Sequence, residues 1–187
     1  FDELLLMKND LKIVIQDPRT STPGLGLLLW IKSIFGDEAS SYWESLQPKI
    51  LTVTKGWSEA YALFLDNEAD MVLSYTTSPA YHLIAEENDN FGAASFSDGH
   101  YMQIEVAAIL KSSSQPELAE KFLNFIITPE FQNVIPTTNW MYPAYEAEIP
   151  DGFKTLIEPN KSLLFPPDEV AMKQKNWIDE WLRASMN

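Results

Sequence analysis

Strand-like and helix-like stretches alternate through the first part of the chain, and this alternation limits the possible folds more than any other feature. Short apolar stretches typical of strands are expected at residues 11–16, 50–54 and 71–74. Apolar residues at helical spacing predict helices at residues 23–35, 42–46, 58–65 and 79–86. Strands separated by helices commonly pair in parallel, with the helices covering the faces of the sheet. The sequence therefore predicts an α/β fold with a parallel or mixed sheet.

The first long helix has clear end signals. Thr22 is expected as its N-cap, Pro23 as its first helical residue, and Gly36 as the residue that ends it. Four tryptophans lie on apolar helical stripes, and a tryptophan in that position usually belongs to the core. The predicted core tryptophans are Trp30, Trp43, Trp177 and Trp181.

The pattern changes in the second part of the chain. Residues 101–110 are expected to form one long strand, and residues 114–117 a capping box that starts a helix. Residues 135–167 are rich in proline and are expected to be mostly irregular, before a final amphipathic helix.

Composition limits the possible partners. A chain of 187 residues with 45% hydrophobic content can bury a substantial core, and a formal net charge of −14 argues against a nucleic-acid partner. The sequence has no cysteine, which excludes disulfides and thiolate chemistry within it, and no apolar stretch of about 18 residues that could span a bilayer.

Because the sequence begins at Phe1, without an initiator Met and within an apparent helix, we expect a fragment or a processed product.

One candidate binding element is the turn between the first strand and the first long helix. The N-terminus of a helix carries partial positive charge and unpaired N–H groups, which suits a phosphate or a carboxylate. The candidate residues there are Ser21, Thr22 and Gly24. The alternative is an ordinary capped helix without a ligand.

A second candidate element consists of aromatic residues next to glycine, proline or hydroxyl residues at the ends of predicted elements. They are Trp57, Tyr75, Tyr81 and Trp140. Aromatic faces stack on flat heterocycles and attract cations, each cation–π contact contributing about 0.5 to 2 kcal/mol. We expect Trp57, Tyr75 and Tyr81 to converge at one edge of the sheet and to form an aromatic ligand pocket.

Catalysis has little support in the sequence. No nucleophile elbow, phosphate-binding loop or metalloprotease motif is present. His82 is expected at the surface or in packing, and His100 in a solvated turn. We therefore predict a protein that is not an enzyme, with no catalytic residue, no metal site and no cofactor.

Five stretches of the sequence, in order and across nearly the whole chain, resemble the periplasmic thiamine-binding proteins of bacterial thiamine ABC transporters, a family of solute-binding proteins. These stretches are residues 17–26, 54–61, 73–81, 99–101 and 139–143. The resemblance implies a periplasmic protein with the two-lobed type II solute-binding fold, each lobe being α/β. This chain would hold mainly the second lobe and a remnant of the first.

The family resemblance also implies a function. Thiamine, thiamine monophosphate or thiamine diphosphate would be held in the cleft and delivered to the permease subunits in the inner membrane. Trp57, Tyr75, Tyr81 and Trp140 would surround the vitamin, and Ser21 with its helix start would face the phosphate.

The resemblance further implies how the chain is divided. Residues 1–10 would be a first-lobe remnant or hinge helix, 11–100 the second lobe, 101–137 a crossover strand and helices of the first lobe, and 138–187 a return to the second lobe. Residues 101–135 would then lack most of their sheet partners, and unpaired edges favour self-association.

Two alternatives remain open at this point. Thiamine-degrading transferases have a similar fold but use a cysteine nucleophile, which this sequence lacks. A binding protein for another small cation, such as a polyamine, would also combine aromatic and acidic residues.

Overall fold

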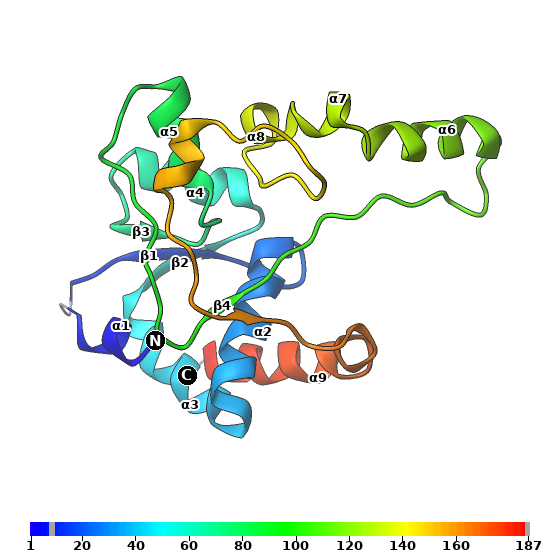
Figure 1. Ribbon diagram of the computed structural model, residues 1–187. Helices are drawn as coiled ribbons and strands as arrows, with labels where there is room; N and C mark the ends of the chain where they lie inside the picture. Colours follow the sequence, from blue (N-terminus) through cyan, green and yellow to red (C-terminus); the bar gives the residue numbers. More distant parts are fainter. Residues whose placement is uncertain (8–9, 186–187) are drawn as a thin grey trace. The chain divides into compact units, whose positions relative to one another are not determined.

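The computed structural model describes residues 1–7 and 10–185, and the chain divides into two compact units (Figure 1). Unit 1 consists of Phe1–Ser74, Ser95–Gln103 and Pro159–Asn187. Unit 2 consists of Tyr75–Ala94 and Ile104–Glu158. Neither unit is a single continuous stretch of sequence.

Unit 1 contains both sheets of the described chain. Its elements are α1 (Asp2–Leu6), β1 (Ile13–Gln16), α2 (Thr22–Phe35), η1 (Gly36–Glu38), α3 (Ala39–Leu46), η2 (Gln47–Lys49), β2 (Ile50–Thr54), α4 (Trp57–Leu65), β3 (Met71–Val72), β4 (His100–Tyr101), β5 (Ser162–Leu163) and α9 (Pro167–Ser185). The main sheet has the order β2-β1-β3, with both pairings parallel. The parallel sheet and the α/β class predicted from the alternation are confirmed.

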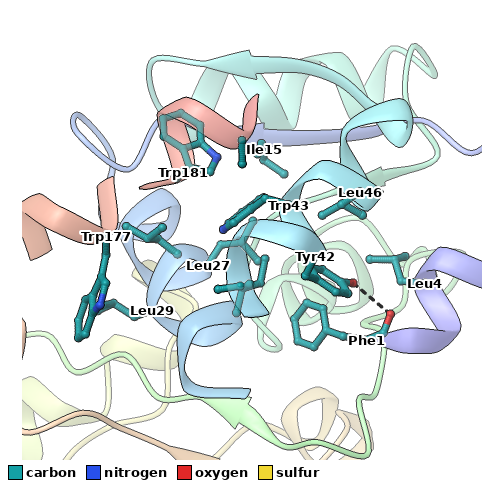
Figure 2. Close-up of a cluster of buried hydrophobic side chains, with 14 of the residues drawn as sticks. Phe1, Leu4, Ile15, Leu27, Leu29, Tyr42, Trp43, Leu46, Trp177 and Trp181 are labelled. Carbon is teal, nitrogen blue, oxygen red and sulfur yellow. Dashed lines mark hydrogen bonds between the residues drawn. The ribbon is translucent and has the colours of Figure 1, made fainter. Parts of the chain in front are cut away.

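The central strand β1 is buried on both faces, as a parallel strand between two helical layers should be. Ile13 and Ile15 belong to a large apolar cluster with residues of α2, α3 and α9 (Figure 2). Val14, which points to the opposite face, packs with Ala60 of α4. Successive side chains of β1 thus face α2, α3 and α9 on one side of the sheet and α4 on the other.

The predicted core tryptophans lie in or against that large cluster. Trp43 is 3% exposed, Trp181 4% and Trp177 8%, and Trp30 is half-buried against the same cluster. Trp43 and Trp181 meet edge to face, with ring centroids 6.4 Å apart. These contacts join α3 to the C-terminal helix and confirm the prediction made from helical spacing.

Several of the predicted bounds in unit 1 are also confirmed, although β1 begins at Ile13 instead of residue 11 and β3 ends at Val72 instead of residue 74. The strand β2 occupies the predicted residues, and α2 ends at Gly36, whose positive φ of 54° suits glycine. The prediction of Thr22 as the N-cap is wrong. The cap is Ser21, whose side chain accepts a hydrogen bond from the backbone N–H of Gly24, and Thr22 is the first helical residue.

Unit 2 is helical where it is regular. Its elements are α5 (Ser78–Ala85), α6 (Pro116–Ile126), α7 (Pro129–Gln132), α8 (Ile135–Thr138) and the 3₁₀ helix η3 (Asp151–Thr155). The predicted capping box is wrong, because α6 begins at Pro116 after Gln115, with no side-chain cap. No residue of α6 is buried, and Leu118, Phe122 and Phe125 are 60%, 53% and 48% exposed.

The long strand predicted at residues 101–110 is also wrong. Only His100 and Tyr101 pair, in parallel with Ser162 and Leu163, and residues 102–110 form neither helix nor strand. A strand requires a neighbour that satisfies its backbone N–H and C=O groups. The N–H of Met102 still donates to the carbonyl of Leu163 in β5 at 2.8 Å, but beyond it no strand of the described chain pairs with this segment. Val106 is 88% exposed, which leaves its apolar side chain in solvent.

Candidate ligand-binding site

A loop of residues 17–21 joins the carboxyl end of β1 to the start of α2. The backbone N–H of Gly24 donates to Ser21 Oγ at 3.4 Å, so one of the unpaired N–H groups at this helix end is capped internally. Gly24 is buried, and a Cβ at this position would lie 2.5 Å from the carbonyl oxygen of Gln16. Close packing of α2 on the end of β1 therefore requires glycine there. Thr22 is exposed.

The loops that follow the neighbouring strands β1 and β2 are tied together. Thr20 Oγ1 donates to the backbone carbonyl of Lys55 at 2.7 Å. In the first loop, the backbone N–H of Arg19 donates to Asp17 Oδ1 at 2.8 Å and Arg19 Nε donates to the same oxygen at 2.9 Å. Hydrogen bonds from Arg19 lower the pKa of the Asp17 carboxyl. The two loops thus form one surface at the carboxyl edge of the sheet, where open α/β sheets commonly bind ligands.

Trp57 is the first residue of α4, so it stands at this same edge after β2. Its indole Nε1–H donates to Ser74 Oγ at 2.9 Å. Its ring stacks on Tyr61, one turn further along the helix, with centroids 4.6 Å apart and an interplanar angle of 24°. The half-buried indole is therefore held from two sides.

The other three predicted aromatic residues belong to unit 2. Tyr81 on α5 is 38% exposed and meets Trp140 edge to face, with centroids 5.2 Å apart. Trp140 follows α8 and has a positive φ of 57°, which is uncommon for a bulky residue. Tyr75 lies in the turn before α5, where its backbone N–H donates to Ser78 Oγ at 3.2 Å. Thr77 Oγ1 lies 3.4 Å from Met141 Sδ and further ties this turn to the Trp140 segment.

The predicted site residues fall into two groups. Ser21, Thr22, Gly24 and Trp57 belong to unit 1, whereas Tyr75, Tyr81 and Trp140 belong to unit 2. Contact within unit 2 between Tyr81 and Trp140 is observed. The convergence of Trp57 with Tyr75 and Tyr81 on one ligand stays a prediction.

Two residues around Trp57 were missed by sequence reasoning, namely Ser74 and Tyr61. The i, i+4 spacing of Trp57 and Tyr61 on a predicted helix could have indicated their ring contact. No sequence signal pairs Trp57 with Ser74, because that contact depends on the order of strands in the sheet.

Both histidines are buried. His82 is 0% exposed, its ring stacks on Phe91 and its Nδ1 lies 2.6 Å from Glu86 Oε2, in agreement with a packing role. The prediction of a solvated His100 is wrong, because its side chain packs against Trp30 and only 8% of the residue is exposed.

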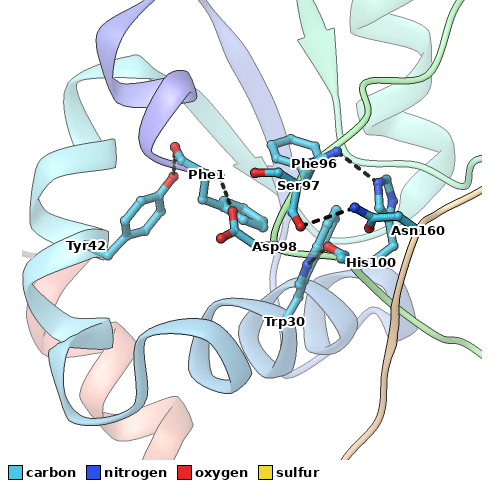
Figure 3. A network of polar contacts seen from close by, with 9 residues as sticks. Phe1, Trp30, Tyr42, Phe96, Ser97, Asp98, His100 and Asn160 are labelled. Atoms are coloured by element: carbon cyan, nitrogen blue, oxygen red, sulfur yellow. Dashed lines mark hydrogen bonds and ion pairs between the residues drawn. The ribbon is translucent and has the colours of Figure 1, made fainter.

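Figure 3 shows His100 within a polar network of unit 1. The backbone N–H of Phe96 donates to His100 Nε2 at 3.1 Å, and burial lowers the pKa of this imidazole. Trp30 Nε1–H donates to the carbonyl of Gly99 at 2.9 Å. Gly99 has a φ of 98° and lies so close to Lys161 that a side chain would not fit. This network secures the β4–β5 segment.

Residues 1–7 and 10–185 contain no group of three or more His, Asp or Glu side chains placed to hold a metal ion. Within the same residues, no helix combines the length and the apolar character needed to cross a bilayer.

Comparison with known proteins gives consistent results. A family model described as "Bacterial extracellular solute-binding protein" matches residues 2–137. Thiamine-binding periplasmic proteins from Salmonella typhimurium and Escherichia coli are each 57% identical to this chain over 182 residues. The matched region is 97% of this chain but 56% of either relative, so the chain spans about half the length of these proteins.

A solved structure described as a periplasmic thiamin binding protein is also similar. It superposes with a TM-score of 0.96 at 56% sequence identity, covering 99% of this chain and 58% of that one. This match confirms the expected α/β fold of a solute-binding protein.

Proposed function

The chain belongs to the family of bacterial extracellular solute-binding proteins, and from this membership we propose that it is part of the periplasmic component of a thiamine ABC importer. In this role the protein captures thiamine and delivers it to permease subunits in the inner membrane. The observation that carries the proposal is the match, over nearly the whole chain, to relatives whose names describe thiamine-binding periplasmic proteins.

The aromatic residues support thiamine as the ligand. Thiamine combines a permanently charged thiazolium ring with a flat aminopyrimidine, and aromatic faces attract both kinds of ring. Trp57, Tyr75, Tyr81 and Trp140 are each half-buried or exposed, so their rings are not fully used in the core. A net charge of −14 also favours the approach of a cation.

We extend the proposal to thiamine monophosphate and thiamine diphosphate. The start of α2 has backbone N–H groups and the positive end of a helix dipole, which favour a phosphate. Ser21 and Thr22 add hydroxyl groups at this point, and Gly24 lets the helix start lie close to the end of β1.

The division of the chain into lobes is likewise a proposal. We propose that residues 1–10 and 101–137 contribute to a first lobe, and residues 11–100 and 138–187 to a second. The exposed apolar side chains of α6 and the absence of strand pairing at residues 104–110 support a missing neighbour for this segment. In isolation, such a surface would favour self-association.

A binding role is favoured over catalysis. The relatives are binding proteins by name, and the cysteine nucleophile of thiamine-degrading transferases has no counterpart in this sequence. The polyamine alternative is not favoured by any contact in the described residues and is tested by competition.

The test is calorimetric titration of the full natural protein that contains this chain. Thiamine, thiamine monophosphate, thiamine diphosphate and spermidine are each titrated, and the 187-residue chain alone is titrated in parallel. We expect saturable binding of thiamine by the full protein, whereas spermidine should neither bind when titrated alone nor compete with thiamine when added beforehand. No binding of any thiamine compound by folded protein would refute the proposed ligand.

A further inference from the structure

We propose that Ser74 and Tyr61 are positioning residues that hold the indole of Trp57 as a platform for the flat, cationic part of the ligand. The inference rests on the proposed function, and it adds two residues that act through Trp57 instead of through contact with the ligand.

Trp57 needs support from other residues to keep one orientation. It is the first residue of α4, and the residue before it, Gly56, is an N-cap without a side chain. A side chain at the first position of a helix has no preceding helical turn to restrict its rotamer. Without other contacts, this indole would sample several orientations and lose entropy on binding.

Two contacts fix different degrees of freedom of the Trp57 indole. The hydrogen bond from Trp57 Nε1–H to Ser74 Oγ sets the direction of the indole edge. The stacked ring of Tyr61, at 4.6 Å and 24°, sets the plane of the indole. Together they define one orientation.

The Trp57–Ser74 contact also places the indole at a defined point of the main sheet. Trp57 follows β2, Ser74 follows β3, and β1 lies between these two strands. The Trp57–Ser74 contact therefore crosses the carboxyl end of β1, the strand that leads into the Ser21 loop. A ligand bound at that loop would meet the indole.

The indole is also only half-buried, so a ligand can reach part of it. Tyr61 stacks on one of its faces. An indole face attracts a planar cation more strongly than a phenyl or phenol ring does.

The experiment uses the full natural protein that contains this chain and titrates thiamine into the parent and its variants by calorimetry. Removal of the acceptor in Ser74→Ala should weaken binding about threefold to tenfold, which is the usual effect of one hydrogen bond. Ser74→Thr keeps a hydroxyl and should restore the affinity. Ser45→Ala is the matched control, because it removes an exposed hydroxyl that donates to the Ser41 carbonyl, away from the site.

The stacking contact is tested in the same way. Tyr61→Phe keeps an aromatic ring and should bind thiamine as the parent does, whereas Tyr61→Leu should bind more weakly. A difference between these two variants at equal thermal stability assigns the effect to ring stacking.

A readout without ligand separates positioning from general destabilisation. The indole N–H resonance of Trp57, identified by its loss in Trp57→Ala, should move upfield and exchange faster with water in Ser74→Ala. It should return towards the parent position in Ser74→Thr.

The outcomes are distinct. If the parent binds thiamine and Trp57→Ala weakens binding while Ser74→Ala and Tyr61→Leu do not, the inference is wrong and the proposed function stands. If the parent does not bind thiamine, the proposed ligand and the inference fall together. Weaker thiamine binding in Ser74→Ala, with recovery of the affinity in Ser74→Thr, supports the inference.

Discussion

The rings of Tyr81 and Trp140 meet edge to face in unit 2, with centroids 5.2 Å apart and planes at 82°. The backbone that presents Trp140 has a φ of 57°, in the left-handed region that glycine usually occupies. Its N–H donates to the carbonyl of Ile135 at 3.1 Å and so closes the end of α8. An aromatic residue therefore stands where the backbone alone would favour glycine.

This backbone conformation predicts that Trp140→Gly is more stable than Trp140→Ala, the reverse of the order expected within a helix. Trp140→Gly and Trp140→Ala both remove the indole, but alanine is strained at positive φ by about 1 kcal/mol relative to glycine. We expect Trp140→Gly to be the more stable of the two by urea unfolding and both variants to bind thiamine equally weakly. The matched pair Tyr81→Gly and Tyr81→Ala, on α5, should show the ordinary order with alanine more stable. The same order in both pairs would contradict the interpretation.

The tryptophans of unit 1 should separate binding from stability. Trp57→Ala is expected to weaken thiamine binding about thirtyfold, as for a central aromatic contact, with a small effect on unfolding. Trp30→Ala removes a ring that contacts Phe1, Phe96 and His100 and should destabilise the fold by about 3 kcal/mol. Calorimetry and urea unfolding of both variants measure the two effects. Unchanged affinity in Trp57→Ala would remove it from the proposed site.

The burial of His100 predicts that the folded protein loses stability in mild acid. Burial lowers the pKa of its imidazole in the folded state, so below about pH 6.5 the unfolded chain binds more protons than the folded chain. Stability should therefore fall as the pH falls from about 6.5 towards the lowered pKa. Protonation would also remove the acceptor for the N–H of Phe96.

The measurement is urea unfolding of the parent and His100→Gln between pH 5 and 8. The variant cannot titrate at this position, so its stability should depend less on pH across this range. If the stability of the two proteins changes with pH in the same way, His100 does not contribute to the pH dependence of stability.

The apolar face of α6 predicts self-association of the 187-residue chain. Leu118 is 60% exposed on this helix, and Leu118→Glu should lower the fraction of oligomer in sedimentation experiments. Leu118→Glu should change the free energy of unfolding by no more than about 0.5 kcal/mol, because the side chain of Leu118 is already largely in solvent. Glu120→Gln on the same helix is the control. Equal association in Leu118→Glu and the parent would exclude this face as the contact.

Local signals predicted the main sheet well. The bounds of β2 and the end of α2 at Gly36 followed from apolar pattern and backbone chemistry, and these are properties of the residues themselves. The predicted N-cap was wrong by one residue because it placed Pro23 at the first helical position, the usual place for proline, whereas Pro23 is the second helical residue.

Properties that depend on distant partners could not be predicted. Residues 102–110 have a strand-like composition, but β-structure depends on a paired neighbour and not on composition alone. The burial of His100 depends on Trp30 and Phe96, which only the tertiary fold brings to it. The division of the predicted aromatic residues between two units likewise has no local sequence signal.

The interleaving of the two units has a consequence for how such a protein can evolve. Because Phe1–Ser74 and Pro159–Asn187 both belong to unit 1, a recombination breakpoint at any single position of the gene segment would divide that unit. Exchange of unit 2 between relatives would need several simultaneous breakpoints. The two units should therefore be inherited together, and their sequences should share one phylogeny.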